Sequence, residues 1–229
     1  MRVQSKITRR FVLSLGIIPV ALQASPLVDL EHSLGLFSNP NGASKSWPSN
    51  RLNLYHDPEP ELKNFDQLQS NKLSKIIIQQ SLNLNLLNSN TNEEISFQFA
   101  DQHELSVGQR SNLDNFLRDW RTDEIKSIDT LVLENFFKIC GLCSNKKNIL
   151  RINVHSGYRS KKTNEYLRKN NHKVARNSMH ILAKAIDFSI PGIGANHLAR
   201  MSRGNTQGGV GRYQNFVHLD SGPKRSWQG

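Results

Sequence analysis

Two short stretches of this chain place the tightest geometric condition on its fold. The first holds His180 and Asp187, seven residues apart with small and apolar residues between them, and the second holds His218 beside Asp220. On one straight strand, a rise of ~3.3 Å per residue would separate His180 from Asp187 by roughly 23 Å. On one helix they would lie about 10 Å apart, which short side chains bridge poorly. The two side chains meet only if the chain turns between them, and Ala183 marks where that turn would close.

Both stretches also alternate as strands do. In residues 183–190, Asp187 occupies the face opposite Ile186 and Phe188. In residues 216–220, His218 and Asp220 share one face, because side chains repeat every two residues along a strand. A turn followed by a strand, joined by a later strand, would therefore bring the two histidines and Asp187 together.

Imidazole nitrogen and carboxylate oxygen are ligands that zinc favours, and a catalytic zinc keeps three protein ligands and one open position. His180, Asp187 and His218 therefore predict a zinc site. Asp220 is a second carboxylate nearby, and two roles remain open for it. It could act as a general base toward water, or it could orient a histidine ligand.

A family resemblance rests on the same stretches, which read Ser178-x-His180, Ala183-x-Ala185-x-Asp187 and Phe216-Val217-His218-x-Asp220. Together they resemble the zinc peptidases of the M15 group, which include D-Ala-D-Ala carboxypeptidases, and the related hedgehog-type zinc domains. The most similar branch is the bacterial cell-wall branch once called DUF882, which contains exported murein endopeptidases. Segments 116–122, 156–164 and 208–213 extend the likeness, which covers the chain from about residue 113 to its end. The resemblance implies a zinc peptidase that cuts peptidoglycan cross-links or stem peptides.

The resemblance also assigns residues before the first histidine. Arg159 matches the arginine that meets the substrate near the scissile carbonyl. A guanidinium there can bind a carboxylate through two hydrogen bonds or stabilise an oxyanion. Ser156 and Tyr158 either shape the same pocket or hold the turn, and His155 is a further candidate for the pocket.

Two positions depart from the family pattern. Ala183 stands where the family usually has glycine, and we expect a turn with negative φ, which alanine accepts. The glutamate that serves as a base in several branches, just before the final histidine, has no counterpart among residues 215–217. A non-catalytic zinc module that recognises the cell wall is therefore the alternative function.

The N-terminus has the layout of an export signal. Arg9 and Arg10 precede an apolar run over residues 11–22 that is too short to span a bilayer, and small residues follow it. The paired arginines resemble a twin-arginine signal. We therefore expect a signal peptide over residues 1–24, a periplasmic location, and no membrane span once the signal is removed. Residues 25–50, rich in Ser, Asn, Pro and Gly, predict a flexible spacer.

The chain is basic, with 30 lysines and arginines against 19 acidic residues and a net charge of +11. A basic protein prefers polyanions such as nucleic acid, anionic lipid or acidic wall polymers. No nucleic-acid recognition motif accompanies the charge. We therefore expect peptidoglycan peptides as the partner, and no nucleic acid.

Strands and helices are intermixed along the chain, which predicts an α+β domain. We expect a small antiparallel sheet with flanking helices, like the hedgehog and DD-peptidase zinc domains, over residues 111–229. Residues 51–110 form a poorly defined N-terminal part. The expected strands are at 51–55, 95–99 and 150–154. The expected helices are one with apolar residues at 113, 116, 117 and 120, capped by Ser111 or Asn112, and two at 128–141 and 163–169. Cys140 and Cys143 are expected to pack in the core or to close an incidental disulfide.

Overall fold

The computed structural model describes residues 59–69, 74–145, 148–170 and 174–229, and there helices and strands are intermixed along the chain. The predicted α+β class is confirmed. The expected signal, the spacer and the strand at 51–55 lie outside these residues. Within the described ranges, no helix has the length and apolar character needed to cross a bilayer.

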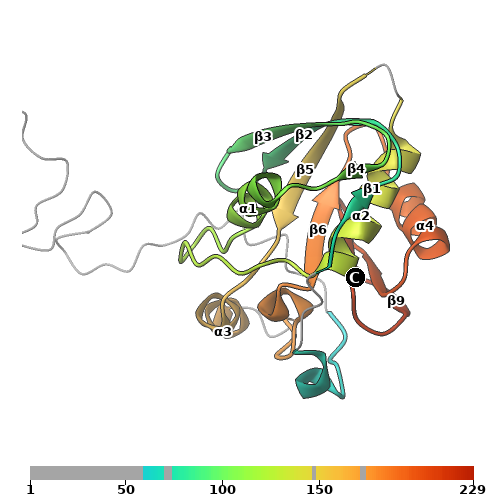
Figure 1. Ribbon diagram of the computed structural model, residues 1–229. Coiled ribbons are helices and arrows are strands. Elements are labelled where there is room, and N and C mark those ends of the chain that lie inside the picture. The colour runs from blue at the N-terminus through green and yellow to red at the C-terminus, as the bar shows by residue number, and fades with distance from the viewer. Residues whose placement is uncertain (1–58, 70–73, 146–147, 171–173) are drawn as a thin grey trace, which may run out of the picture. The chain divides into compact units, whose positions relative to one another are not determined.

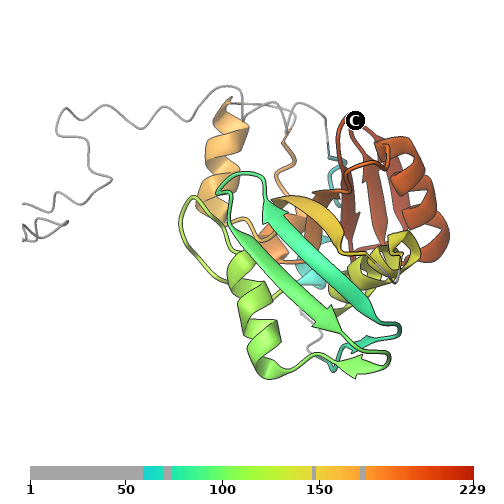
Figure 2. The same cartoon turned by 90° about the horizontal axis from the view of Figure 1, so that it is seen from above.

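The sheet of the described residues is mixed, with the strand order β3-β2-β5-β6-β8-β7-β9. The expectation of a small antiparallel sheet is wrong, because β2 pairs with β5 and β7 pairs with β9 in parallel. Figure 2 shows the β2–β3 pair and the C-terminal strands toward opposite ends of this sheet. Its strands are β2 (Leu82–Asn88), β3 (Glu94–Phe99), β5 (Leu150–Ser156), β6 (Ala185–Ser189), β7 (Gly209–Arg212), β8 (Val217–Asp220) and β9 (Arg225–Gln228). A separate short pair joins β1 (Ile77–Ile78) to β4 (His103–Glu104).

Strand β2 lies in the part at 51–110, in a stretch where leucine alternates with asparagine. Its leucines at 82, 84 and 86 are buried and the residues between them are half-buried. Such alternation suits a sheet with one face against the core. The strand predicted at 95–99 therefore pairs with β2, and both strands join β5 although they precede residue 111.

Four α-helices accompany the sheet in the described residues, namely α1 (Val107–Phe116), α2 (Thr130–Cys143), α3 (Lys161–Asn170) and α4 (Ala195–Asn205). The helices predicted at 128–141 and 163–169 are confirmed as α2 and α3. Helix α1 begins earlier than expected, because Ser106 and Gln109 form a capping box and neither Ser111 nor Asn112 is the cap. Cys140 is buried in α2 and both of its cysteines are free thiols.

Helices α2 and α4 lie next to each other against the β6, β8 and β7 part of the sheet (Figure 1). The ring of Phe136 in α2 meets Phe188 of β6 edge-on, with centroids 5.1 Å apart. Since Phe188 faces α2, its neighbour Asp187 faces the other side of the sheet. The helix layer thus leaves that second face for Asp187 and the residues around it.

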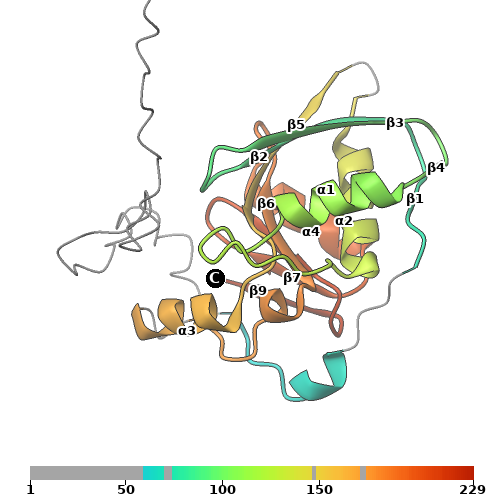
Figure 3. The same cartoon turned by 60° about the vertical axis from the view of Figure 1, so that its left-hand side comes forward.

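Helix α3 lies away from α2 and α4, near the short 3-10 helices η2 (Phe65–Leu68) and η3 (Met179–Leu182), as Figure 3 shows. A second apolar cluster joins η2 to η3, with Leu62, Met179 and Leu182 buried in it. This group of short elements covers the sheet on the Asp187 side.

Packing of α2 makes a testable contribution to stability. Leu133 is fully buried in α2, whereas Leu142 in the same helix is 50% exposed. We expect Leu133→Ala to lower the free energy of unfolding by about 2–5 kcal/mol, because it removes buried methyl groups and leaves a cavity. Urea denaturation measures the change. Leu142→Ala is the matched control and should cost less than about 1 kcal/mol; equal losses in both variants would contradict this packing.

Candidate metal centre

The turn that carries His180 is the helix η3. Ser178 caps it by accepting a hydrogen bond from the backbone N–H of His180. Ala183 then closes the turn with a φ of 57°, and its N–H donates to the carbonyl of His180 at 3.1 Å. The expected negative φ is wrong. The left-handed conformation explains the glycine that the resemblance leads one to expect here, and alanine accepts it at a cost of about 1–2 kcal/mol.

The turn is tied to the start of α2. The N–H of Asp129, the N-cap of α2, donates to the carbonyl of Ala183 at 2.8 Å. The ammonium of Lys184 lies 3.3 Å from the carboxylate of Asp129. These contacts fix where β6 begins, and therefore where Asp187 lies.

Three donor side chains from η3, β6 and β8 converge on the sheet face opposite α2. Asp187 and His218 are paired across the antiparallel strands β6 and β8. Nε2 of His180 lies 3.1 Å from Asp187 Oδ2, and Nδ1 of His218 lies 2.8 Å from Asp187 Oδ1. The two histidine nitrogens are 3.2 Å apart. All three residues are buried.

These separations fit a small tetrahedral ion. Bonds of about 2.0–2.1 Å to a tetrahedral zinc place neighbouring donor atoms about 3.3 Å apart. The three observed separations lie within about half an ångström of that length, with nitrogen and oxygen donors that zinc favours. The residues that the sequence singled out therefore have the spacing and chemistry to hold zinc.

Contacts on the outer side of each ring set the tautomers. Nδ1 of His180 lies 2.7 Å from the carbonyl of Gly157, so it carries the proton and donates. Nε2 of His218 lies 3.1 Å from Asp220 Oδ2 and donates in the same way. When a cation takes the place of the protons between the rings and Asp187, the nitrogens that face Asp187 present lone pairs to it. Metal-binding histidines are generally oriented by such hydrogen bonds.

Electrostatics at the three donors favour a bound cation. Burial favours the neutral carboxyl of Asp187, but the charge of His180 and hydrogen bonds from both histidines outweigh it and hold the pKa of Asp187 below its ordinary range. Burial likewise disfavours the imidazolium of His218, but hydrogen bonds to Asp187 and Asp220 raise its pKa to about 10. A cation that binds here displaces the proton on His218, so its affinity rises with pH.

Asp220 is saturated with hydrogen bonds and fully buried. Its Oδ1 accepts from the N–H groups of Gly209 and Gly222 at 3.0 and 2.8 Å and from Arg225 at 3.0 Å. Its Oδ2 pairs with Arg225 at 2.8 Å and with His218. A Cβ at position 209 would collide with this carboxylate, which explains the glycine there. These contacts fix the position of the Asp220 carboxylate beside His218.

Arg159 is buried beside the three donors. Its backbone N–H donates to the carbonyl of His180 at 3.1 Å, and its Nη1 donates to Asn164 Oδ1 at 3.2 Å. Ser156 is paired with Asp187 across β5 and β6, and its Oγ lies 3.5 Å from Nδ1 of His180. Both residues therefore adjoin the donor group.

Tyr158 and His155 lie at the edges of the donor group. The N–H of Tyr158 donates to the carbonyl of Leu117, and its ring is 5.7 Å from the ammonium of Lys126. Nε2 of His155 lies 2.9 Å from the hydroxyl of Ser189. Burial lowers the pKa of His155, although the Asp187 carboxylate acts in the opposite direction. Tyr158 thus packs on the α1 side, and His155 borders the Asp187 face.

Two glutamates from the segment before β1 were missed by the sequence reasoning. The carboxylate of Glu61 accepts from the N–H groups of Arg176 and Asn177 at 2.5 and 3.2 Å. Glu59 accepts from the N–H of Met179 at 3.4 Å, and its charge helps to raise the pKa of His218. The segment thus holds the loop that leads into η3. The sole trace in the sequence is the alternation of proline and glutamate over residues 58–61, which has no helical or strand period.

An aromatic wall also borders the donors. The ring of Tyr213 stacks on Phe216 with centroids 4.5 Å apart, and its hydroxyl accepts from Trp227 Nε1 at 3.1 Å. The ring of Trp227 lies 5.2 Å from that of His218. Burial and the Asp187 carboxylate raise the pKa of Tyr213, so its hydroxyl keeps its proton at neutral pH.

Comparison with known proteins gives consistent matches. The chain is 38% identical over 146 residues to peptidoglycan L,D-endopeptidase MepK of Escherichia coli (strain K12), covering 63% of this chain and 79% of that protein. It is 36% identical over 151 residues to the probable peptidoglycan L,D-endopeptidase MepK of Haemophilus influenzae, covering 64% and 78%. No solved structure matches the chain. A family model described as peptidoglycan L,D-endopeptidase MepK matches residues 77–227, which is well over half of the chain. The chain therefore belongs to this family of M15 peptidases.

Proposed function

We propose that the protein is a zinc-dependent endopeptidase that cuts peptidoglycan at a bond joining an L-configured to a D-configured residue. The convergence of His180, Asp187 and His218 carries the proposal, in a chain that belongs to the MepK family of M15 peptidases. The bond type in this proposal, L to D, is taken from the relatives, which are described as peptidoglycan L,D-endopeptidases. Residues 1–24 carry four basic and no acidic side chains, so the chain without them has a net charge of +7, which suits a polymer that carries many carboxylates.

The metal ligands in this proposal are Nε2 of His180, the carboxylate of Asp187 and Nδ1 of His218. Zinc, when bound, acts as a Lewis acid toward the scissile carbonyl and makes water a better nucleophile. Arg159 is held beside the ligands by its hydrogen bonds to His180 and Asn164. Its guanidinium either stabilises the negative charge that develops on the scissile carbonyl oxygen or binds a nearby carboxylate of the substrate.

Two roles were open for Asp220: a general base toward water, or a residue that orients a histidine ligand. In this proposal Asp220 orients His218. The four hydrogen bonds of Asp220, its ion pair with Arg225 and its burial support a role in holding His218, because a general base needs a lone pair that water can reach. Arg225 holds the Asp220 carboxylate, and that carboxylate accepts from Nε2 of His218. Together they hold the imidazole ring of His218 so that its Nδ1 faces the other two ligands.

Asp220→Asn separates this role from that of a base. We expect zinc affinity to fall about 10–100-fold, because the amide oxygen would stay with the N–H groups of Gly209 and Gly222 and the amide NH2 would face Nε2 of His218, which then loses its acceptor. Saturating zinc should then restore most of kcat. Zinc titration followed by hydrolysis at saturating zinc measures both. Asp123→Asn is the control, since that side chain is 79% exposed. A kcat that stays low at saturating zinc would instead make Asp220 the base.

We also propose an exported protein. A signal over residues 1–24 and a spacer over residues 25–50 would deliver the domain at 111–229, with the part at 51–110, to the periplasm, by the twin-arginine route. This location agrees with a peptidoglycan substrate. Fractionation of producing cells would test it: the protein should appear in the periplasm and remain in the cytoplasm when Arg9 and Arg10 are replaced by lysine.

The activity is tested with purified cross-linked muropeptides, with and without a chelator. We expect zinc-dependent products whose masses place the cut at an L–D bond. Products that form equally in the presence of the chelator would contradict the zinc dependence. Binding to the wall without any hydrolysis would support the non-catalytic recognition module instead.

A further inference from the structure

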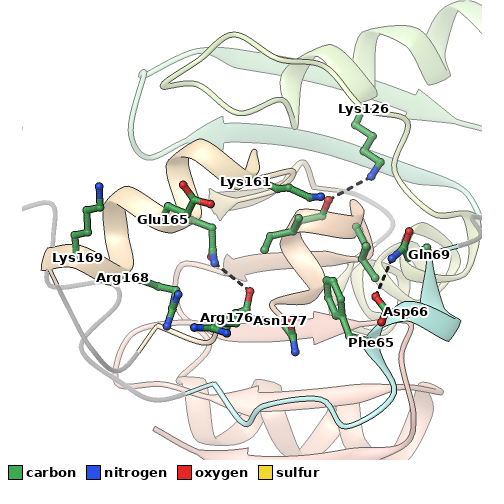
Figure 4. A pocket seen from close by; sticks show the side chains of 13 residues that line it. Phe65, Asp66, Gln69, Lys126, Lys161, Glu165, Arg168, Lys169, Arg176 and Asn177 are labelled. Carbon is green, nitrogen blue, oxygen red and sulfur yellow. Dashed lines mark hydrogen bonds between the residues drawn. The ribbon is translucent and has the colours of Figure 1, made fainter.

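A hollow with a cationic rim adjoins the candidate metal centre. Its volume is about 830 Å³, within the range of sites that bind small molecules and short peptide segments. It lies between η2, α3 and the segment that leads through Arg176 to η3 (Figure 4). Ile181 and Leu182, which line it, directly follow His180 in the chain. We call it the basic pocket.

Positive charge dominates the basic pocket. Asp66 and Glu165 are the acidic side chains that line it, whereas the cationic side chains are Lys126, Lys161, Arg168, Lys169 and Arg176. Among the described residues, the last four of these cations form no ion pair with a carboxylate. Asp66 accepts a hydrogen bond from Gln69. The charges on the rim are therefore available to a ligand.

The cations of the basic pocket also act on one another. Lys126 is half-buried, and its ammonium donates to the carbonyl of Ile181 at 3.3 Å. Burial lowers the pKa of Lys126, and the charges of Lys161 and Lys184 lower it further. The charge of Lys161 therefore disfavours the charged form of Lys126. A bound anion would relieve this repulsion between the lysines. Separate lysines on a fully solvated surface would show no such repulsion.

The floor of the basic pocket is apolar. Ile181 and Leu182 are 7% and 5% exposed, and the half-buried ring of Phe65 lies beside them. Free phosphate or sulfate needs no such floor. A ligand that fits both features carries anionic groups on a body of small aliphatic groups, as an acidic peptide with short side chains does.

The basic pocket is coupled to the candidate site through Asn164. This side chain lines the pocket, accepts from Arg159 at 3.2 Å, and donates to the carbonyl of Ala175 at 3.1 Å. A peptide that lies in the pocket is thus one side chain away from the arginine assigned to the substrate. Ligands on the two sides of Asn164 would belong to one extended substrate.

We propose that the basic pocket is a second binding site, which takes the carboxylate-rich peptide stem of peptidoglycan beyond the bond that is cut. This inference rests on the proposed function. The pocket adds affinity for the polymer through charge and apolar contact, whereas the metal centre performs the hydrolysis. Electrostatic complementarity of this kind chiefly sets specificity and the rate of association.

Binding of zinc-free protein to purified sacculi tests the proposal without any catalysis. The variant Lys161→Glu/Arg168→Glu reverses two rim charges of α3. We expect its Kd for sacculi, measured by co-sedimentation, to rise about tenfold. The control Lys162→Glu/Arg200→Glu makes the same change of net charge at exposed residues outside the pocket lining and should change Kd less than about threefold. A second variant, Lys161→Gln/Arg168→Gln, should give an intermediate Kd, and circular dichroism checks that each variant is folded.

Sacculi with methyl-esterified carboxylates identify the ligand. Wild-type protein should bind them as weakly as the charge-reversed variant binds untreated sacculi. Equal Kd values for the pocket variant and the control, or unchanged binding to esterified sacculi, would overturn the proposal. Because hydrolysis is not measured, pocket-dependent binding by a protein that cuts no muropeptide would refute the proposed enzyme and leave the basic pocket standing.

Discussion

A His180→Ala variant is expected to lose at least about a thousandfold in kcat/KM on cross-linked muropeptides, which corresponds to about 4 kcal/mol of transition-state stabilisation. The change removes one of three donors that lie 2.8–3.2 Å from one another. Two remaining donors hold zinc weakly, so both the ion and the chemistry that it supplies are lost. Chromatographic analysis of the digestion products measures the rate.

The matched control for this variant is His197→Ala. His197 is an exposed histidine of α4, outside the donor group, so its loss should leave zinc content and activity at the wild-type level. If His180→Ala retained more than a tenth of the wild-type activity at equal zinc, the metal centre would not be the site of hydrolysis.

Arg159→Ala is the second variant with a large expected effect. We expect kcat to fall by about 10²–10³-fold, as when one preorganised donor to a developing oxyanion is removed. Zinc content should not change, because Arg159 is not a ligand. Arg159→Lys should recover part of the rate, since lysine keeps the charge but lacks the fork of guanidinium donors.

The control for Arg159 is Arg151→Ala on the same strand-to-turn segment, where the side chain is exposed. Its kcat should match the wild type. A loss of zinc from Arg159→Ala would show that the arginine holds the site together, and an unchanged kcat would remove it from the chemistry.

The convergence of His180, Asp187 and His218 was predictable because its conditions are local. Strand alternation places His218 and Asp220 on one face, and the same alternation sets Asp187 opposite Phe188. The distance between His180 and Asp187 along any straight element demands a turn. The structure has that turn at Ala183.

Other features depend on contacts that no local pattern encodes. The left-handed φ of Ala183 is disfavoured for alanine and is held by the surrounding turn. The parallel pairing of β2 with β5 joins segments more than sixty residues apart. The hydrogen bonds of Glu59 to the first residue of η3 and of Glu61 to the loop before η3 span more than a hundred residues. Alternation and spacing in the sequence determine which face of a strand a side chain occupies. Which distant segments pair with each other depends on the assembled fold.

Reconstitution of metal-free protein with zinc tests the central claim most directly. Hydrolysis of cross-linked muropeptides should be absent in the metal-free protein, increase in proportion to added zinc and reach its maximum at one zinc ion per chain. The His180→Ala variant should gain no activity over the same range. Full hydrolysis by the metal-free protein, or none at one equivalent of zinc in the wild type, would contradict the account.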